Sequence, residues 1–334
     1  MPPLQSPTAL VDGFGRTIDY VRLSVTDRCN LRCTYCMAET MTFLPRHDLL
    51  TLEELALLAE HLVGRGVRRV RITGGEPLVR RGIETLFDRI GALIGAGLDE
   101  LTLTTNGTRL AGMAEALQRA GVRRVNVSLD TLDPHRFAEV TRGGDLAQVL
   151  AGIEAAGAAG LGVKINAVAM KGVNEDEFGR LARWCARDGH DLAIIETMPL
   201  GETGSNRKDS YLPVSVAQDA IAGHFDLAPS RYRTGGPARY FELGDSGARV
   251  GFISPLSNNF CATCNRIRIA ATGTVYGCLG HDQKVELRDI IRSGGAPALD
   301  AALDRLLSGK PERHGFDLSR PAPAVARHMS VTGG

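Results

Sequence analysis

Three cysteines lie within eight positions in the segment CNLRCTYC, at Cys29, Cys33 and Cys36. Three thiolates this close together are typical of a metal site, but an iron–sulfur cube and a structural zinc ion each usually take four ligands. No fourth cysteine follows in this segment. The spacing C-x₃-C-x₂-C therefore predicts a zinc ion with one distant ligand or a four-iron cluster with one iron open to a small molecule. We favour the cluster, because zinc sites generally show two paired ligand sets.

A second triplet, Cys261, Cys264 and Cys278, lies near the C-terminus. His281 follows Cys278 closely, so a Cys₃His zinc site is a plausible alternative here. The presence of the first triplet makes a second iron–sulfur cluster the favoured interpretation. The seventh cysteine, Cys185, stands alone in a helical pattern, and we expect it to be a small buried hydrophobic residue.

The charge balance and the cysteine count limit the class of protein. A net charge of +1 and 43% hydrophobic residues are ordinary for a globular protein, with no overall field that would attract nucleic acid or a membrane. An odd number of clustered cysteines argues against a disulfide framework. No apolar run approaches the ~18 residues that span a bilayer, and residues 1–20 lack the pattern of a signal peptide. We expect a cytoplasmic protein.

Strand-then-helix units fill the first part of the chain. Strands are expected at 20–25, 68–73, 100–105, 123–129, 162–169 and 192–198, and helices at 51–65, 84–96, 111–121, 146–160 and 175–189. Six such units predict a parallel sheet with right-handed crossovers. We expect an α/β fold, an incomplete (β/α)₆ TIM-like barrel at residues 1–200, although the pattern also permits a doubly wound sheet. Residues 201–334 should form a C-terminal α+β extension that carries the second triplet.

Polar side chains share one face of the expected strands. In the segment RVRIT, Arg71 and Thr73 alternate with apolar residues, and the later strands repeat this alternation. Because both faces of a parallel sheet are usually buried, the polar faces should converge on one cavity. Arg266 and Arg268 would share a face if extended, and arginine pairs form bidentate bonds with phosphate. The cations predict a compact polyanion such as a nucleoside triphosphate, held without a P-loop.

The segment CNLRCTYC, including Tyr35 before the last cysteine, resembles the signature of the radical S-adenosylmethionine (SAM) family. The segment ITGGEP at residues 72–77 resembles the second motif of that family. The resemblance implies that SAM fills the fourth place of the first cluster and is cleaved to methionine and a 5′-deoxyadenosyl radical. It also implies SAM contacts at Tyr35, Gly75, Ser128 and Met198.

Further motifs, from LTTNG through VSLDTL, KINAV and FCATCNRIR to the terminal Gly333-Gly334, resemble the branch of this family that cyclises GTP in the first step of molybdenum cofactor biosynthesis. The resemblance implies two [4Fe-4S] clusters, one on each triplet, removal of the 3′ hydrogen of GTP and closure of a bond to C8, which gives (8S)-3′,8-cyclo-7,8-dihydroguanosine 5′-triphosphate. It implies catalytic assistance by Gly333 and Gly334. The implied GTP contacts are Arg22, Arg71, Thr104, Lys164, Arg266, Ile267 and Arg268.

The same resemblance implies partners and leaves alternatives open. The partners are a downstream cyclic pyranopterin monophosphate synthase and an electron donor such as flavodoxin or ferredoxin, and a homodimer is left open. One alternative is a radical SAM peptide or protein maturase with an auxiliary cluster, which usually needs more than three extra cysteines and has no need of Arg266 and Arg268. The other is a non-catalytic Cys₃His zinc or iron–sulfur binding module.

Overall fold

The computed structural model describes residues 9–203, 207–320 and 322–333. The strands of this part of the chain form one sheet in the order β12-β11-β10-β1-β2-β3-β4-β5-β6-β9-β8-β7. They are β1 Tyr20–Ser24, β2 Arg69–Thr73, β3 Glu100–Thr105, β4 Arg124–Ser128, β5 Gly162–Ala169, β6 Asp191–Glu196, β7 Leu227–Pro229, β8 Arg239–Leu243, β9 Arg249–Ile253, β10 Arg266–Ile269, β11 Thr274–Tyr276 and β12 Lys284–Glu286.

Helices follow most of the strands. They are α1 Leu52–Gly64, α2 Ile83–Gly91, α3 Ala114–Arg119, α4 Pro134–Thr141, α5 Leu146–Ala158, α6 Phe178–Asp188, α7 Arg207–Ser210, α8 Val214–Ala222, α9 Arg288–Ser293, α10 Gly295–Ser308 and α11 Met329–Thr332. No helix of the described ranges is both long enough and apolar enough to cross a membrane.

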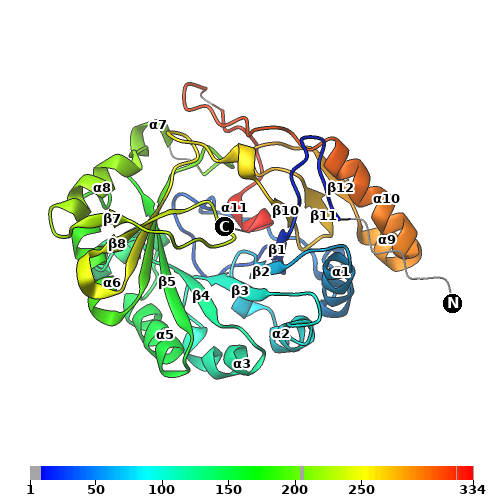
Figure 1. Cartoon of the computed structure of the whole chain (residues 1–334), viewed down its shortest axis with the longest axis horizontal. Helices are drawn as coiled ribbons and strands as arrows, with labels where there is room; N and C mark the ends of the chain where they lie inside the picture. Colours follow the sequence, from blue (N-terminus) through cyan, green and yellow to red (C-terminus); the bar gives the residue numbers. More distant parts are fainter. Residues whose placement is uncertain (1–8, 204–206, 321, 334) are drawn as a thin grey trace.

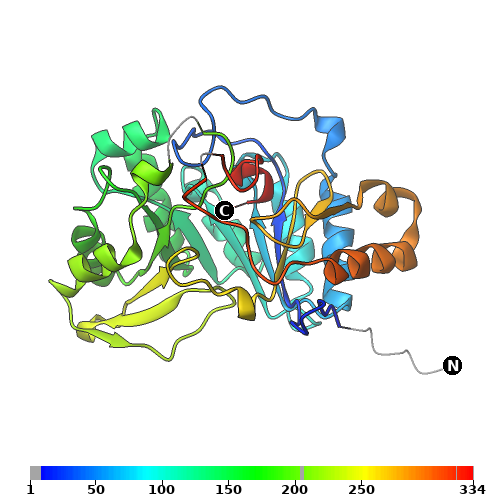
Figure 2. The same cartoon turned by 90° about the horizontal axis from the view of Figure 1, so that it is seen from above.

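The first six strands are parallel and lie side by side in chain order. The sheet curves, with helices α1 to α6 on its outer side and the short helix α11 on its inner side (Figures 1 and 2). A doubly wound sheet would reverse its strand order at a switch point, and no reversal occurs between β1 and β6. The partial (β/α)₆ barrel is therefore confirmed, and all six predicted strands are found.

The residues after 200 extend the same sheet at both of its edges. Strand β10 pairs in parallel with β1, and β9 pairs in parallel with β6. The remaining strands, β7, β8, β11 and β12, continue outward in antiparallel fashion. The C-terminal part thus shares the barrel's sheet, and the division of the chain at residue 200 stays a prediction.

Local signals in the sequence explain how the elements begin. Thr51 and Glu54 form a capping box at the start of α1, in which each side chain accepts the backbone N–H of the other. Helix α4 was not predicted from the sequence. Two signals for its start are present, because Asp133 caps it and Pro134 occupies its first turn. The apolar faces of the strands pack beneath these helices, and Cys185 on α6 is fully buried in that core, as expected.

Candidate functional site

One cavity lies on the inner face of the curved sheet, and both cysteine triplets line it. Sixteen of the residues that the sequence analysis assigned to sites reach this cavity. They are Arg22, Cys29, Cys33, Tyr35, Cys36, Arg71, Gly75, Thr104, Ser128, Lys164, Met198, Cys261, Cys264, Arg266, Arg268 and Cys278. The first triplet follows the carboxyl end of β1, whereas Cys264 precedes β10, which runs parallel to β1. The two triplets therefore lie toward opposite ends of the strands.

Three predicted site residues are placed differently. Ile267 is fully buried in the hydrophobic core and does not line the cavity, because it alternates with Arg266 and Arg268 along β10. Gly333 follows α11, and its carbonyl accepts a hydrogen bond from Arg268. A Cβ built on Gly333 would lie 1.9 Å from the Thr73 hydroxyl, so only glycine fits between them. Gly334 lies outside the described residues.

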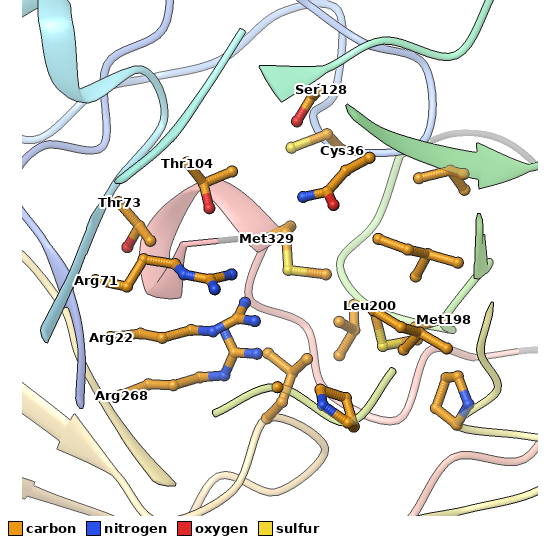
Figure 3. A pocket seen from close by; sticks show the side chains of 18 of the residues that line it. Arg22, Cys36, Arg71, Thr73, Thr104, Ser128, Met198, Leu200, Arg268 and Met329 are labelled. Carbon is orange, nitrogen blue, oxygen red and sulfur yellow. The ribbon is translucent and has the colours of Figure 1, made fainter. Parts of the chain in front are cut away.

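A row of arginines crosses three neighbouring strands between the two triplets. Arg22 on β1 is in register with Arg268 on β10 and with Arg71 on β2. Figure 3 shows the three side chains next to one another and pointing into the cavity, with Cys36 and Ser128 across from them. Arg71 and Arg268 are each only 8% exposed. The row forms a buried cationic wall.

These buried cations are held mainly by neutral groups. Arg71 Nε donates to the Thr102 hydroxyl at 3.4 Å, and Lys164 Nζ donates to the Tyr240 hydroxyl at 2.5 Å. Burial is the main cause that lowers the pKa of Arg71 to about 10, and nearby cations add to it. Burial and the adjacent Arg71 also hold the pKa of Lys164 well below its usual value. A bound polyanion would relieve this repulsion.

Several polar atoms around the cavity have no hydrogen-bond partner within the described residues. They include Arg22 Nε, Arg266 Nε, Thr73 Oγ1 and Thr104 Oγ1, all buried. Buried polar atoms in native proteins are almost always hydrogen-bonded, and exceptions often mark a binding site. Their grouping beside the arginine row points to a ligand with many acceptor oxygens.

The first cysteine loop is held by backbone contacts with the end of β2. Gly75 N–H donates to the Thr26 carbonyl at 2.8 Å, and Glu76 N–H donates to the Arg28 carbonyl at 2.8 Å. A Cβ on Gly75 would lie 2.4 Å from the Arg28 carbonyl oxygen. The family resemblance implies a SAM contact at this glycine. The structure shows that its lack of a side chain first allows close packing against the cysteine loop.

Two buried carboxyl groups lie beside the first triplet, and their hydrogen bonds come from neutral donors. Glu76 is fully buried and accepts hydrogen bonds from the Thr105 hydroxyl and from the N–H groups of Leu78 and Asn106. Burial raises the pKa of Glu76 to about 7 despite these donors. Burial likewise raises the pKa of Asp130 to about 6, and Asp130 accepts the hydroxyl of Tyr35 in the cysteine loop.

The second triplet has cations in its surroundings. Lys310 is 2% exposed, and its ammonium donates to the Gly277 carbonyl at 2.8 Å and to Cys264 Sγ at 3.5 Å. Burial alone would raise the pKa of Cys264, but Lys310 and Arg266 outweigh it and lower that pKa. Lys310 could not be assigned from the sequence, because it lies 46 residues from Cys264 and no spacing signal links the two.

The geometry gives the zinc alternative no support. In the described part of the chain, no three His, Cys, Asp or Glu side chains gather closely enough to hold a single ion. A four-iron cluster binds each thiolate to a different iron, so its ligands are spread more widely. His281 does not line the cavity, and its Nε2 lies 2.9 Å from the Arg313 carbonyl. Two sets of three thiols around one cavity fit two clusters better.

Comparisons with known proteins identify two family regions. Residues 23–185 match the radical SAM superfamily, and residues 190–316 match the family described as Molybdenum Cofactor Synthesis C. A GTP 3′,8-cyclase from Erythrobacter litoralis is 54% identical over 327 residues, which cover 97% of this chain and 98% of the relative. A GTP 3′,8-cyclase from Paracoccus denitrificans is 56% identical over 329 residues, which cover 97% of this chain and 96% of the relative.

Among solved structures, Streptococcus suis SuiB bound to S-adenosylmethionine is similar in fold. Its TM-score is 0.64 at 15% identity, over 95% of this chain and 78% of that chain. This likeness supports the fold alone. The family follows from the sequence relatives: the chain belongs to the GTP 3′,8-cyclases of the radical SAM superfamily.

Proposed function

We propose that the cavity of this GTP 3′,8-cyclase holds SAM near the first cysteine triplet and GTP between the two triplets. The protein carries out the first step of molybdenum cofactor biosynthesis, in which GTP is cyclised, and uses [4Fe-4S] clusters with SAM. The observation that carries the residue-level proposal is the arginine row, which lies between two sets of three thiols in a single cavity.

The donor sets fit the two clusters. Cys29, Cys33 and Cys36 would hold the first, and Cys261, Cys264 and Cys278 would hold the second, with one iron of each left for a small molecule. Bound together, the first cluster and SAM supply a radical able to remove a hydrogen atom from the ribose. We assign SAM contacts to Tyr35, Gly75, Ser128 and Met198, all of which line the cavity.

The cationic wall would bind and orient the nucleotide. Arg22, Arg71, Lys164, Arg266 and Arg268 would hold the triphosphate, and the unpaired hydroxyl of Thr104 would add a hydrogen bond. Charge-assisted hydrogen bonds to phosphate are stronger than neutral ones and fix orientation when they are bidentate. The buried wall also keeps water away from a reactive radical, and holding both reactants in contact lowers the entropic part of the barrier. The side chain of Ile267, which is in the core, has no part in this wall.

We assign an assisting role to the C-terminal Gly333 and Gly334. Gly333 lies between Thr73 and Arg268 in the structure, within the cationic wall. The proposed partners are an electron donor such as flavodoxin or ferredoxin, a downstream cyclic pyranopterin monophosphate synthase that consumes the product, and a second copy of the chain. The cytoplasmic location stays a prediction.

The nucleotide assignment is tested with Arg266→Ala in anaerobically reconstituted protein. We expect GTP affinity to fall by about tenfold or more, which is roughly 1.4 kcal/mol per tenfold, with iron content and GTP-independent SAM cleavage unchanged. Affinity is measured by equilibrium binding, and 5′-deoxyadenosine by chromatography with GTP, ATP or no nucleotide. Arg119→Ala is the matched control, because Arg119 is 68% exposed on α3. GTP affinity equal to that of the control would remove Arg266 from the site.

A further inference from the structure

The C-terminal tail, residues 322–333, is attached to the rest of the protein at three places. Near its start, Ala324 N–H donates to the Pro199 carbonyl and Gly201 N–H donates to the Val325 carbonyl, each at 2.9 Å. At its end, Arg268 Nη1 donates to the Thr332 carbonyl at 3.4 Å and to the Gly333 carbonyl. The tail therefore runs from the loop after β6 to the arginine row (Figure 2).

The third attachment is Arg327, which lies between these two. Its Nη2 donates to three backbone carbonyls of the second triplet's loop, those of Cys278 at 3.1 Å, Leu279 at 2.6 Å and His281 at 2.7 Å. Its Nη1 contacts Asp282 at 2.5 Å. Its guanidinium lies over the Tyr276 ring, 4.1 Å from the centroid.

These contacts require the shape of an arginine. A planar guanidinium can meet several carbonyls on one edge and stack on an aromatic ring at the same time, whereas an ammonium is a point charge. The Arg327 side chain is 9% exposed, and Arg327 does not line the cavity. It is therefore placed to hold two chain segments together and cannot reach the substrate itself.

We propose that Arg327 is a positioning residue that couples the loop of Cys278 to the C-terminal tail, so that loading of the second triplet places Gly333 at the arginine row. The proposal rests on the assisting role assigned above to the terminal glycines. The loop at 278–282 carries the Cys278 thiol, which would bind the second cluster. The carbonyls of this loop orient the Arg327 guanidinium, and residues 328–333 of the tail follow Arg327 in the chain. Loop geometry and tail position are thus joined through one side chain.

The test uses full-length, anaerobically reconstituted Arg327→Lys and Arg327→Ala. We expect the iron content of wild type, hydrogen exchange in residues 322–334 faster by about tenfold or more, and a kcat for cyclised product lower by about 10- to 100-fold with little change in KM for GTP. Arg320→Ala is the matched control, because Arg320 is 73% exposed and pairs with the nearby Asp317. The control should match wild type in all three measurements.

A second comparison tests the link to the metal site. A Cys264→Ser chain, which loses a ligand of the second cluster, should show the same fast exchange in its tail. Adding Arg327→Ala to that chain should then change the exchange no further, because the two substitutions break the same connection. Additive effects on tail exchange would overturn the coupling.

The outcomes separate Arg327 from the tail itself. A tail that stays protected in both Arg327 variants, or a wild-type kcat, overturns the proposal. Loss of iron in both variants would make Arg327 a residue of the metal loop alone and would also overturn it. If deletion of Gly333-Gly334 leaves turnover intact, the catalytic role of the glycines fails, while the exchange data still decide whether Arg327 connects the loop and the tail.

Discussion

The loops of the two cysteine triplets are held in place by different kinds of contact. The first loop pairs backbone to backbone with the end of β2, where Gly75 and Glu76 donate to the carbonyls of Thr26 and Arg28. The second loop is held by long cationic side chains, because Lys310 and Arg327 donate to its carbonyls. Guanidinium groups donate to carbonyls in both loops, since Arg32 and Arg142 do so in the first. The buried charges still differ: the carboxyl groups of Glu76 and Asp130 lie beside the first loop, whereas Lys310 and Arg266 lower the pKa of Cys264 in the second.

This difference fits the two ligands proposed for the two triplets. The first loop is anchored by backbone contacts and lies beside buried carboxyl groups, which suits a ligand that carries an ammonium group, as SAM does. A loop among buried cations favours thiolates and continues into the arginine row, which suits an anionic nucleotide. Three sets of substitutions test this contrast.

The largest effect should come from removing one thiol at each triplet. Cys33→Ser and Cys264→Ser should each lower the iron content to about half of the wild-type value. Cys33→Ser should also abolish 5′-deoxyadenosine formation, whereas Cys264→Ser should still cleave SAM and yield no cyclised nucleotide. Iron analysis and chromatography of both products check this. Cys185→Ala, in the core, is the control that should keep both activities, and equal behaviour of the two serine variants would erase the contrast.

A smaller effect should follow from adding one methyl group to each loop region. In Gly75→Ala the new Cβ would lie 2.4 Å from a backbone carbonyl oxygen, and in Gly280→Ala it would lie 2.8 Å from the Phe316 ring. Backbone cannot easily move away, so Gly75→Ala should lower the free energy of unfolding by about 3 kcal/mol or more, and Gly280→Ala by less than about 1.5 kcal/mol.

Urea unfolding of the metal-free chains measures both values. Gly64→Ala is the control, since a Cβ there meets nothing within 4 Å at the end of α1. Its stability should equal or slightly exceed that of wild type. Equal losses at Gly75 and Gly280 would show that the first loop is no more rigidly packed than the second.

The smallest effect should be a pH dependence confined to the first loop. Burial raises the pKa of Asp130 to about 6 from 3.8, so the folded chain keeps this proton after the unfolded chain has lost it. The stability that this gives is complete below about pH 4 and is lost as the pH rises through about 6, a change of up to about 3 kcal/mol. Asp130→Asn should lack this loss.

The measurement is the free energy of unfolding of wild type and Asp130→Asn at several pH values across that window. The difference should grow in favour of Asp130→Asn as the pH rises. Lys310→Met, at the second loop, should keep the wild-type slope in this range. A parallel pair of pH curves for wild type and Asp130→Asn would contradict the assignment.

Sequence predicted best what depends on local alternation. Side chains of a strand point to alternate faces, so the order of residues alone places Arg71, Thr104 and Lys164 on the cavity side. The same alternation places the side chain of Ile267 in the core, and a contact of this residue with GTP stays a prediction. Lys310 and Arg327 could not be found in this way, because their hydrogen bonds join residues 33 to 49 positions apart.

The local sequence pattern could not predict which strands pair with the two edges of the barrel. An α+β extension was expected after residue 200, and local pattern did not predict that its strands β9 and β10 continue the barrel's sheet in parallel. The sequence of neither strand indicates which strand it pairs with. Their positions follow from the unpaired edges that β1 and β6 would otherwise present.

Those two edges have a consequence for biosynthesis. While a ribosome makes this chain, all of β1 to β6 emerges before residue 249, the first of β9, and before residue 266, the first of β10. Until then both outer strands of a parallel sheet have open hydrogen-bonding groups, which are a template for aggregation. During that interval the nascent chain can pair with other copies of itself through these edges. A chain truncated before residue 249 should therefore accumulate as insoluble material.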